Sequence, residues 1–176
     1  MEQDIDEPTP RTDGIIGVDT GYGVLATIVD GATGENEAFP NPAALAKHER
    51  KLATLQRELS RRQKGSANRA KTKAKIAKLH AKIANIREHH LHNVSRAIVD
   101  KGAEAVAVEG FNVRDMMSEA TQDTSGRYAQ RAKRLADAGI GELRRQLAYK
   151  QAWAGGRLIT IDASPHPSHI KTGRPE

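Results

Sequence analysis

The sequence predicts an α/β fold in which a mixed sheet carries an inserted long, basic helical hairpin. Two apolar runs of strand length, residues 15–20 and 23–30, lie on either side of a Gly-rich turn near the start of the chain. Between residues 43 and 101 the spacing of apolar residues lengthens to about 3.5, the period of packed helices. Strands that are separated by such helices favour parallel pairing through right-handed crossovers.

The first two strands are expected to form a hairpin, because the glycines between them are typical of a tight turn. A third short strand is expected after the Gly-containing turn at residues 31–34, ending near Phe39. Pro40 and Pro42 then stop the sheet and allow a helix to begin.

Two helices are predicted between residues 43 and 101, each with one narrow apolar seam. The polar stretch "RRQKGSANR" interrupts the pattern, which places the turn near Gly65, and Gly102 follows the end of the second helix. We expect the two seams to face each other, with the lysines and arginines pointing outward. The seam residues are Leu45, Leu52, Leu55 and Leu59 in the first helix, and Ile76, Leu79, Ile83, Ile86 and His90 in the second.

The last third of the chain adds two strands and one helix. The alternating stretch at residues 103–111 predicts a buried strand that ends in Glu109, and residues 112–127 have no period and predict a loop. One helix is expected from residue 134 to the glycine pair at 155–156, and "RLITID" predicts the last strand. Residues 14–165 would then form a single domain between disordered tails at 1–13 and 166–176.

Composition excludes several classes of site and location. The chain has 176 residues and no cysteine, so it contains neither a disulfide nor a thiolate zinc site. No run approaches the roughly 20 apolar residues of a membrane span. The acidic start, "MEQDIDEPTPRTD", lacks the basic and apolar regions of a signal peptide. A cytoplasmic protein with no membrane partner is expected.

Charge is segregated along the chain, although the net charge is only +6. The segment 47–87 holds fourteen of the 28 Lys and Arg residues but two of the 22 Asp and Glu residues, which makes it formally +12 and the remainder −6. A solvated helical face is the ordinary explanation of a charge run, but so strong a bias favours a polyanionic partner. We expect nucleic acid to contact Arg57, Arg61, Arg62, Lys64, Arg69, Lys71, Lys73, Lys75, Lys78, Lys82 and Arg87.

Two carboxylates, Asp19 and Glu109, occupy the ends of two predicted apolar strands. Parallel pairing would bring them together, and like charges in such proximity raise each other's pKa unless a cation intervenes. Mg²⁺ prefers oxygen ligands and is commonly held by one or two carboxylates, and metals held in this way support phosphodiester hydrolysis. The alternatives are that Asp19 caps its turn and that Glu109 is a strand-end acid in contact with solvent.

Several motifs in a fixed order resemble the TnpB family, also called OrfB, of insertion-sequence transposases. They are "GVDTG" with "LATIVDG", the basic stretch from "KLATLQREL" to "NVSRAIV", then "AVEGFNVRDM", and finally "ADAGIGELRRQLAYKQAWAGGRLITID". The resemblance covers roughly residues 14–165. It implies an RNase H-like, RuvC-type nuclease domain and an RNA-guided DNA endonuclease whose partners are DNA and guide-type RNA. It also implies that Asp19 and Glu109 are the first and second catalytic acids and hold Mg²⁺.

The sequence also departs from this family. Family members continue into a four-cysteine zinc ribbon and a third catalytic Asp, whereas this chain ends at Glu176 with no cysteine, so the resemblance implies a domain that is truncated at both ends and incomplete at the C-terminus. With two of three carboxylates, weak Mg²⁺ binding and little or no cleavage by this chain alone are expected, and whether it is an enzyme stays open.

Two other functions remain alternatives. A non-catalytic DNA- or RNA-binding regulator derived from a transposase would use the same basic hairpin without hydrolysis. An actin-like ATPase is suggested by "GVDTGYG", which also resembles the first phosphate loop of that superfamily, but no second Asp-containing Gly-rich segment follows.

Overall fold

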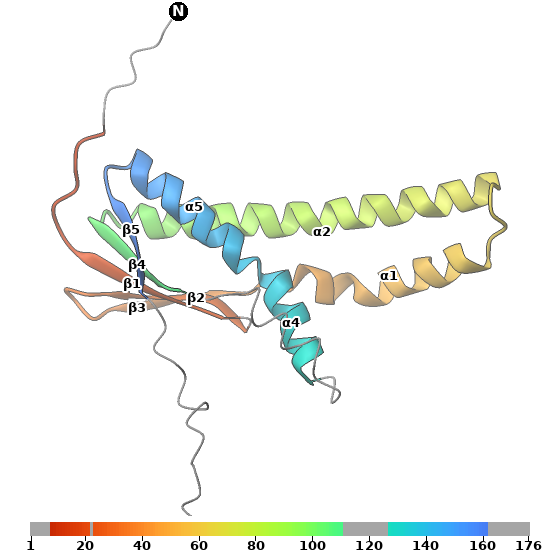
Figure 1. Ribbon diagram of the computed structural model, residues 1–176, viewed down its shortest axis with the longest axis horizontal. Helices are drawn as coiled ribbons and strands as arrows, with labels where there is room; N and C mark the ends of the chain where they lie inside the picture. Colours follow the sequence, from red (N-terminus) through yellow and green to blue (C-terminus); the bar gives the residue numbers. More distant parts are fainter. Residues whose placement is uncertain (1–7, 22, 111–126, 162–176) are drawn as a thin grey trace, which may run out of the picture.

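The computed structural model describes residues 8–21, 23–110 and 127–161. Strands β1 (Ile15–Thr20), β2 (Val24–Asp30) and β3 (Asn36–Pro40) come first, followed by helices α1 (Ala44–Arg61) and α2 (Ala67–Val99). Strand β4 (Ala105–Glu109), helices α4 (Arg127–Ala138) and α5 (Ile140–Trp153) and strand β5 (Arg157–Ile161) complete the described elements. The predicted α/β fold with an inserted helical hairpin is confirmed (Figure 1).

The five strands form one mixed sheet in the order β3-β2-β1-β4-β5. Strand β1 pairs antiparallel with β2, as the hairpin pattern predicted. It pairs parallel with β4, whose partner residues lie 90 positions further along the chain, as in the pair Val18 and Val108. Strand β5 continues the sheet parallel to β4. A parallel neighbour requires a crossover connection, and the long α1–α2 hairpin supplies it between β3 and β4.

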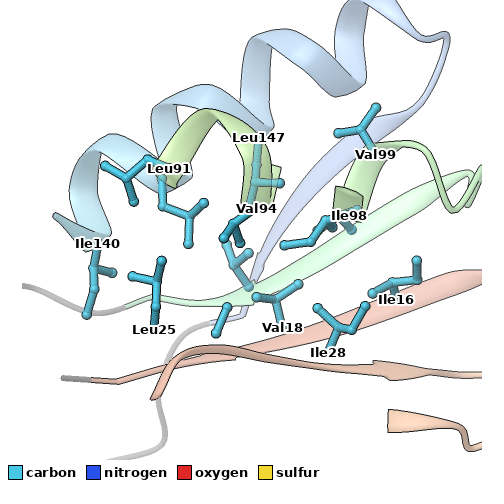
Figure 2. Packing of buried hydrophobic residues seen from close by; sticks show 14 of the residues in the cluster. Ile16, Val18, Leu25, Ile28, Leu91, Val94, Ile98, Val99, Ile140 and Leu147 are labelled. Carbon is cyan, nitrogen blue, oxygen red and sulfur yellow. The ribbon is translucent and has the colours of Figure 1, made fainter. Parts of the chain in front are cut away.

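The hydrophobic core lies between the sheet and two helices. Helix α5 and the C-terminal half of α2 cover one face of the sheet, as Figures 1 and 2 show. Alternate residues of β1, Ile16 and Val18, are 2% and 4% exposed, and they pack with Leu91 and Ile98 of α2 and with Leu147 of α5. The alternate residues that are buried on the strands and the apolar side of α2 therefore pack into one cluster.

The hairpin has a second, smaller apolar cluster. Leu79 and Ile83 of α2 are buried against half-buried Leu52 and Leu55 of α1, so the two predicted seams do face each other. Ser66 caps α2 by accepting the Arg69 backbone N–H, and Figure 1 shows this end of the hairpin extending well beyond the sheet. None of the helices in the described ranges is long and apolar enough to cross a bilayer.

The prediction of one helix between residue 134 and the glycine pair is wrong, because Gly139 divides it. Gly139 has φ 72°, a left-handed conformation that ends α4 and precedes α5. A Cβ built at Gly139 would lie 3.0 Å from Leu91 Cδ1 and 3.1 Å from Arg87 Cδ. The bend therefore brings the backbone close to α2. Helix α4 begins at the last residue of the predicted 112–127 loop, and the rest of that loop lies outside the described residues.

Residues 8–13 belong to the segment that was expected to be a disordered tail, and here they contact the domain. The Arg11 side chain donates a 2.8 Å hydrogen bond to the Val99 carbonyl, and the Arg11 backbone N–H donates to the Gly155 carbonyl. Residues 1–7 and the predicted tail at 166–176 lie outside the described part of the chain.

Asp137 joins three helices at the base of the hairpin. This buried carboxylate of α4 accepts the Leu45 backbone N–H at the start of α1, at 3.1 and 3.0 Å to its two oxygens. It also forms an ion pair with Arg87 of α2, whose Nη2 lies 2.8 Å from Asp137 Oδ1. Because Ala43 offers no side-chain cap to α1, Asp137 satisfies a helix-start donor from another element.

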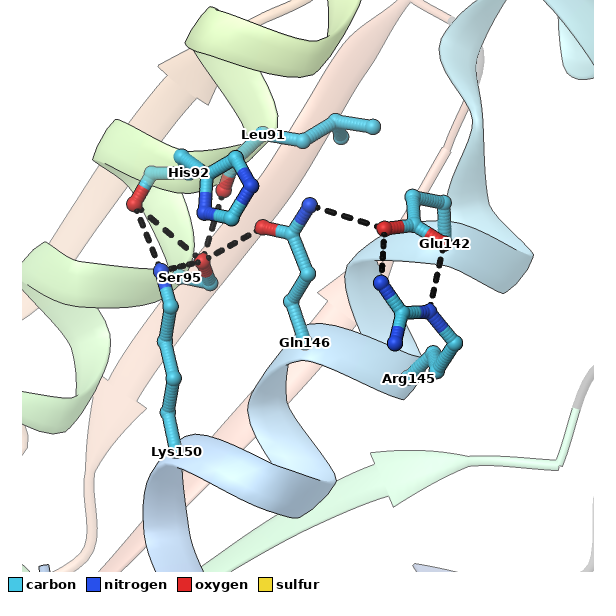
Figure 3. Close-up of polar contacts among 7 residues, drawn as sticks. All are labelled: Leu91, His92, Ser95, Glu142, Arg145, Gln146 and Lys150. Carbon is cyan, nitrogen blue, oxygen red and sulfur yellow. Dashed lines mark hydrogen bonds and ion pairs between the residues drawn. The ribbon is translucent and has the colours of Figure 1, made fainter. Parts of the chain in front are cut away.

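A polar network fastens α5 to α2 (Figure 3). Buried Ser95 donates to Gln146 Oε1 at 2.9 Å, and Gln146 donates onward to Glu142 at 3.0 Å. Lys150 Nζ donates to Ser95 Oγ at 2.7 Å, and burial lowers the pKa of Lys150. Hydrogen bonds from Arg145, and then from Gln146, lower the pKa of Glu142 to about 2.

We expect Asp137→Ala to lower the free energy of unfolding by about 1–3 kcal/mol, because it leaves the α1 donor and the Arg87 guanidinium without their acceptor. Urea denaturation followed by circular dichroism measures the loss. Asp100→Ala is the matched control, since its ion pair with Arg96 spans 3.4 Å between side chains that are 79% and 64% exposed. An equal loss in both variants would contradict this role of Asp137.

The lowered pKa of Glu142 predicts a pH-dependent contribution to stability. The ionised carboxylate stabilises the fold fully above its unfolded pKa, and this contribution is lost as pH falls through the folded value of about 2. The stability advantage of the wild type over Glu142→Gln should therefore shrink between about pH 5 and pH 2. Glu88→Gln, at an exposed position of α2, is the control for the loss of one carboxylate.

Candidate functional site

Asp19 and Glu109 lie at neighbouring positions of two adjacent parallel strands. The register pairs Val18 of β1 with Val108 of β4, and the two acids are the next residue on each strand. Both therefore lie at the carboxyl ends of their strands, on the same edge of the sheet. Ninety residues separate them in sequence, and the crossover geometry brings them together.

Strand alternation determines how Asp19 is presented. Val18 and Thr20 are 4% and 8% exposed and belong to the buried face, whereas Asp19 between them is exposed. Glu109 is half-buried and follows four buried residues of β4. An exposed acid beside a half-buried one leaves carboxylate oxygens available to a ligand at this edge.

The donor set fits a hard divalent cation. Two carboxylates at neighbouring strand ends offer only oxygen ligands, which Mg²⁺ prefers, and an exposed position leaves room for its waters. Within residues 8–21, 23–110 and 127–161, no third His, Cys, Asp or Glu side chain joins them to form a larger ligand group. Among the described residues, the pair therefore offers a metal two carboxylate ligands.

A small cavity adjoins Glu109 where α5 begins. It has a volume of about 70 Å³ and is lined by Thr20, Glu109, Gly141 and Arg144, together with apolar residues of the core. The Thr20 hydroxyl is buried and has no hydrogen-bond partner among the described residues. The cavity thus places one free hydroxyl and one cation beside Glu109, whereas Asp19 does not line it.

Arg144 lines this cavity together with Glu109, and the sequence analysis did not single it out. Its Nη2 donates to Thr160 Oγ1 of β5 at 2.5 Å, so α5 holds this guanidinium next to the strand ends. Arg145 directly follows it but pairs with Glu142 on its own helix instead. The sequence alone does not distinguish Arg144 from Arg145, because which of the two reaches β5 depends on the side of α5 that faces the sheet.

The predicted nucleic-acid-binding residues fall into two groups. Three of them are half-buried and bonded within the protein: Arg62 pairs with Glu58, Arg69 donates to the Leu59 carbonyl at 2.8 Å, and Arg87 pairs with Asp137. The others are exposed on the hairpin and form no ion pair with a described residue. These are Arg57, Arg61, Lys64, Lys71, Lys73, Lys75, Lys78 and Lys82.

Comparison with known proteins gives consistent sequence matches. The family model OrfB_IS605, described as "Probable transposase", matches residues 1–120. The chain is 39% identical over 167 residues to "Putative RNA-guided DNA endonuclease InsQ" of Escherichia coli K12, a match covering 91% of this chain and 40% of that protein. It is 33% identical over 152 residues to "Putative RNA-guided DNA endonuclease MT2953" of Mycobacterium tuberculosis, covering 85% and 32%. The chain therefore spans about a third to two fifths of these relatives.

Solved structures share the fold. A chain in the cryo-EM structure of the Cas12f1-sgRNA-target DNA complex superposes with TM-score 0.52 at 15% identity, over 90% of this chain and 37% of that one. A chain of the CRISPR-Cas12f ternary complex gives TM-score 0.56 at 17% identity, over 93% and 31%. The mixed sheet with its inserted hairpin is thus RuvC-like, and the chain belongs to the TnpB (OrfB) family of insertion-sequence transposases.

Proposed function

We propose that this chain is the nuclease-domain part of a TnpB-type transposase, in which Asp19 and Glu109 hold Mg²⁺ and the α1–α2 hairpin binds nucleic acid. The observation that carries the proposal is the β1–β4 register, which sets the two acids side by side. The relatives named as RNA-guided DNA endonucleases and the Cas12f complexes with RNA and DNA support DNA and guide-type RNA as its partners.

The proposal gives the acids, Arg144 and the hairpin cations different roles. Asp19 and Glu109 supply anionic oxygens for a divalent cation, which activates water and neutralises charge in phosphodiester hydrolysis when it is bound. Arg144 offers a positive charge next to Glu109, where a phosphate of the substrate backbone would lie. The exposed cations of the hairpin neutralise backbone phosphates and fix the strand relative to the acids.

The described residues supply two protein ligands, which make a weak metal site, so we propose that this chain alone cleaves DNA slowly or not at all. Positioning and charge neutralisation supply most of the rate in metal-assisted phosphoryl chemistry, and a ligand set of two supplies less of both. The other candidate is a non-catalytic nucleic-acid-binding regulator, which the free cations of the hairpin favour and which has no need of the acids.

Metal binding separates these two functions. We expect Asp19→Asn and Glu109→Gln each to weaken Mn²⁺ binding, measured by electron paramagnetic resonance, by about tenfold or more, which is about 1.4 kcal/mol. Asp13→Asn, an exposed acid just before the other end of β1, is the matched control and should leave the affinity unchanged.

Cleavage of end-labelled DNA in Mg²⁺, with and without added RNA, tests the reaction itself. Any hydrolysis by the chain should disappear in Asp19→Asn and in Glu109→Gln and persist in Asp13→Asn. Mn²⁺ affinity that is the same in all three variants, without cleavage by the wild type, would favour the regulator. Cleavage that survives loss of both acids would exclude this pair as the active site.

A further inference from the structure

The cavity beside Glu109 contains a buried hydroxyl to which the proposed function gives no role. Thr20, the last residue of β1, is 8% exposed and lines this cavity of about 70 Å³. Its Oγ1 is buried and forms no hydrogen bond with a described residue. Such a group is unfavourable without a partner, because burial removes its hydrogen bonds to bulk water. The partner of this hydroxyl is therefore expected in the cavity that it lines.

Strand alternation places Thr20 at the cavity and Asp19 away from it. Val18 and Thr20 belong to the buried side of β1, whereas Asp19 belongs to its exposed side and does not line the cavity. The backbone of Thr20 is held by its pairing with Ala26 of β2. Thr20 thus follows one candidate acid in sequence but shares its surroundings with the other, Glu109.

Two charged residues line the same cavity. Arg144 uses a single N–H donor for Thr160 Oγ1, at 2.5 Å, so its other guanidinium donors remain available. Glu109 is half-buried, and its carboxylate forms no hydrogen bond or ion pair with a described residue. A hydroxyl, a guanidinium and an acid therefore line one cavity without bonding directly to one another.

Water is the molecule that fits this combination of groups. The volume of about 70 Å³ exceeds the roughly 10–15 Å³ that one water needs, and buried waters commonly bridge polar groups that lack a protein partner. Water donates to a carboxylate and accepts from a guanidinium, and a hydroxyl can serve as either partner. An anion would be repelled by Glu109 and a cation by Arg144, so a neutral molecule with both donors and acceptors is favoured.

We propose that Thr20 is a positioning residue for Glu109 and acts through water held in this cavity, an inference that rests on the proposed function of Glu109 as a Mg²⁺ ligand. Thr20 and Arg144 hold the water, and the water donates to the Glu109 carboxylate and restricts its orientation. Groups that orient a metal ligand in this way commonly contribute about 10–100-fold to metal affinity. Because Asp19 does not line the cavity, the effect is confined to one of the two acids.

Mn²⁺ affinity of the full chain, measured by electron paramagnetic resonance, tests this role. Thr20→Val replaces the hydroxyl with a methyl group of similar size and should weaken binding by about tenfold. Thr20→Ser keeps the hydroxyl and should retain the wild-type affinity. Thr72→Val is the matched control, since Thr72 is a buried threonine of the hairpin whose hydroxyl donates to the Asn68 carbonyl at 3.1 Å, and it should leave Mn²⁺ binding unchanged.

A double-mutant cycle separates positioning of Glu109 from a general disturbance of the strand end. In the E109Q background T20V should cause little further loss of Mn²⁺ affinity, because the carboxylate that the water orients is gone. In the D19N background T20V should keep its effect of about tenfold. Equal further losses in both backgrounds would indicate a general disturbance and would overturn the inference.

The water itself can be observed in a crystal structure of the full chain. The wild type should show a water within hydrogen-bond distance of Thr20 Oγ1, and T20V should lack it. The observation on the wild type decides the point even if T20V does not fold.

Three further results would overturn the inference while the proposed function stands. They are a wild-type cavity without water, a T20S variant that binds Mn²⁺ as weakly as T20V, and a T20V variant with wild-type affinity when D19N and E109Q have lost theirs. If D19N and E109Q also keep the wild-type affinity, the proposed metal site is wrong, and the role of Thr20 is excluded with it.

Discussion

The parallel pairing of β1 with β4 is the constraint on which the arrangement of this protein depends. Parallel neighbours cannot be joined by a tight turn, so the chain has to leave the sheet after β3 and return in the same direction. The α1–α2 hairpin fills that connection. The same pairing places Asp19 beside Glu109. The parallel pairing therefore accounts both for the neighbouring positions of the candidate acids and for the long connection that the hairpin fills.

Helix α2 serves two environments along its 33 residues. Its C-terminal half carries Leu91, Val94 and Ile98 into the core beneath α5, and its N-terminal half carries a narrow seam that only α1 covers. A narrow seam leaves most of the helix circumference polar. This explains how a chain with a mean hydropathy of −0.63 can be well packed at one end and highly charged at the other.

The sequence was sufficient for features that repeat locally. Strand alternation predicted β1 and β2, and the spacing of three and four predicted both seams. The expected parallel pairing of two strands that end in acids predicted that Asp19 and Glu109 would be neighbours, and their role as a site stays a prediction. Features that depend on a tertiary partner were not predictable. The apolar spacing at residues 134–154 continues across Gly139 and so predicted one helix, whereas the left-handed conformation of Gly139 and its close approach to α2 are features of the tertiary structure. Likewise, Asp137 caps α1 and Arg144 turns toward β5 through contacts that no local pattern encodes.

The continuity of α2 has a mechanical consequence. An uninterrupted helix of 33 residues is about 50 Å long, and its far end is anchored in the core at Ile98 while its near end carries the hairpin tip. A stiff rod held at one end acts as a lever. A load at the tip would therefore reach the C-terminal half of α2, where Ser95 donates to Gln146 of α5 at 2.9 Å.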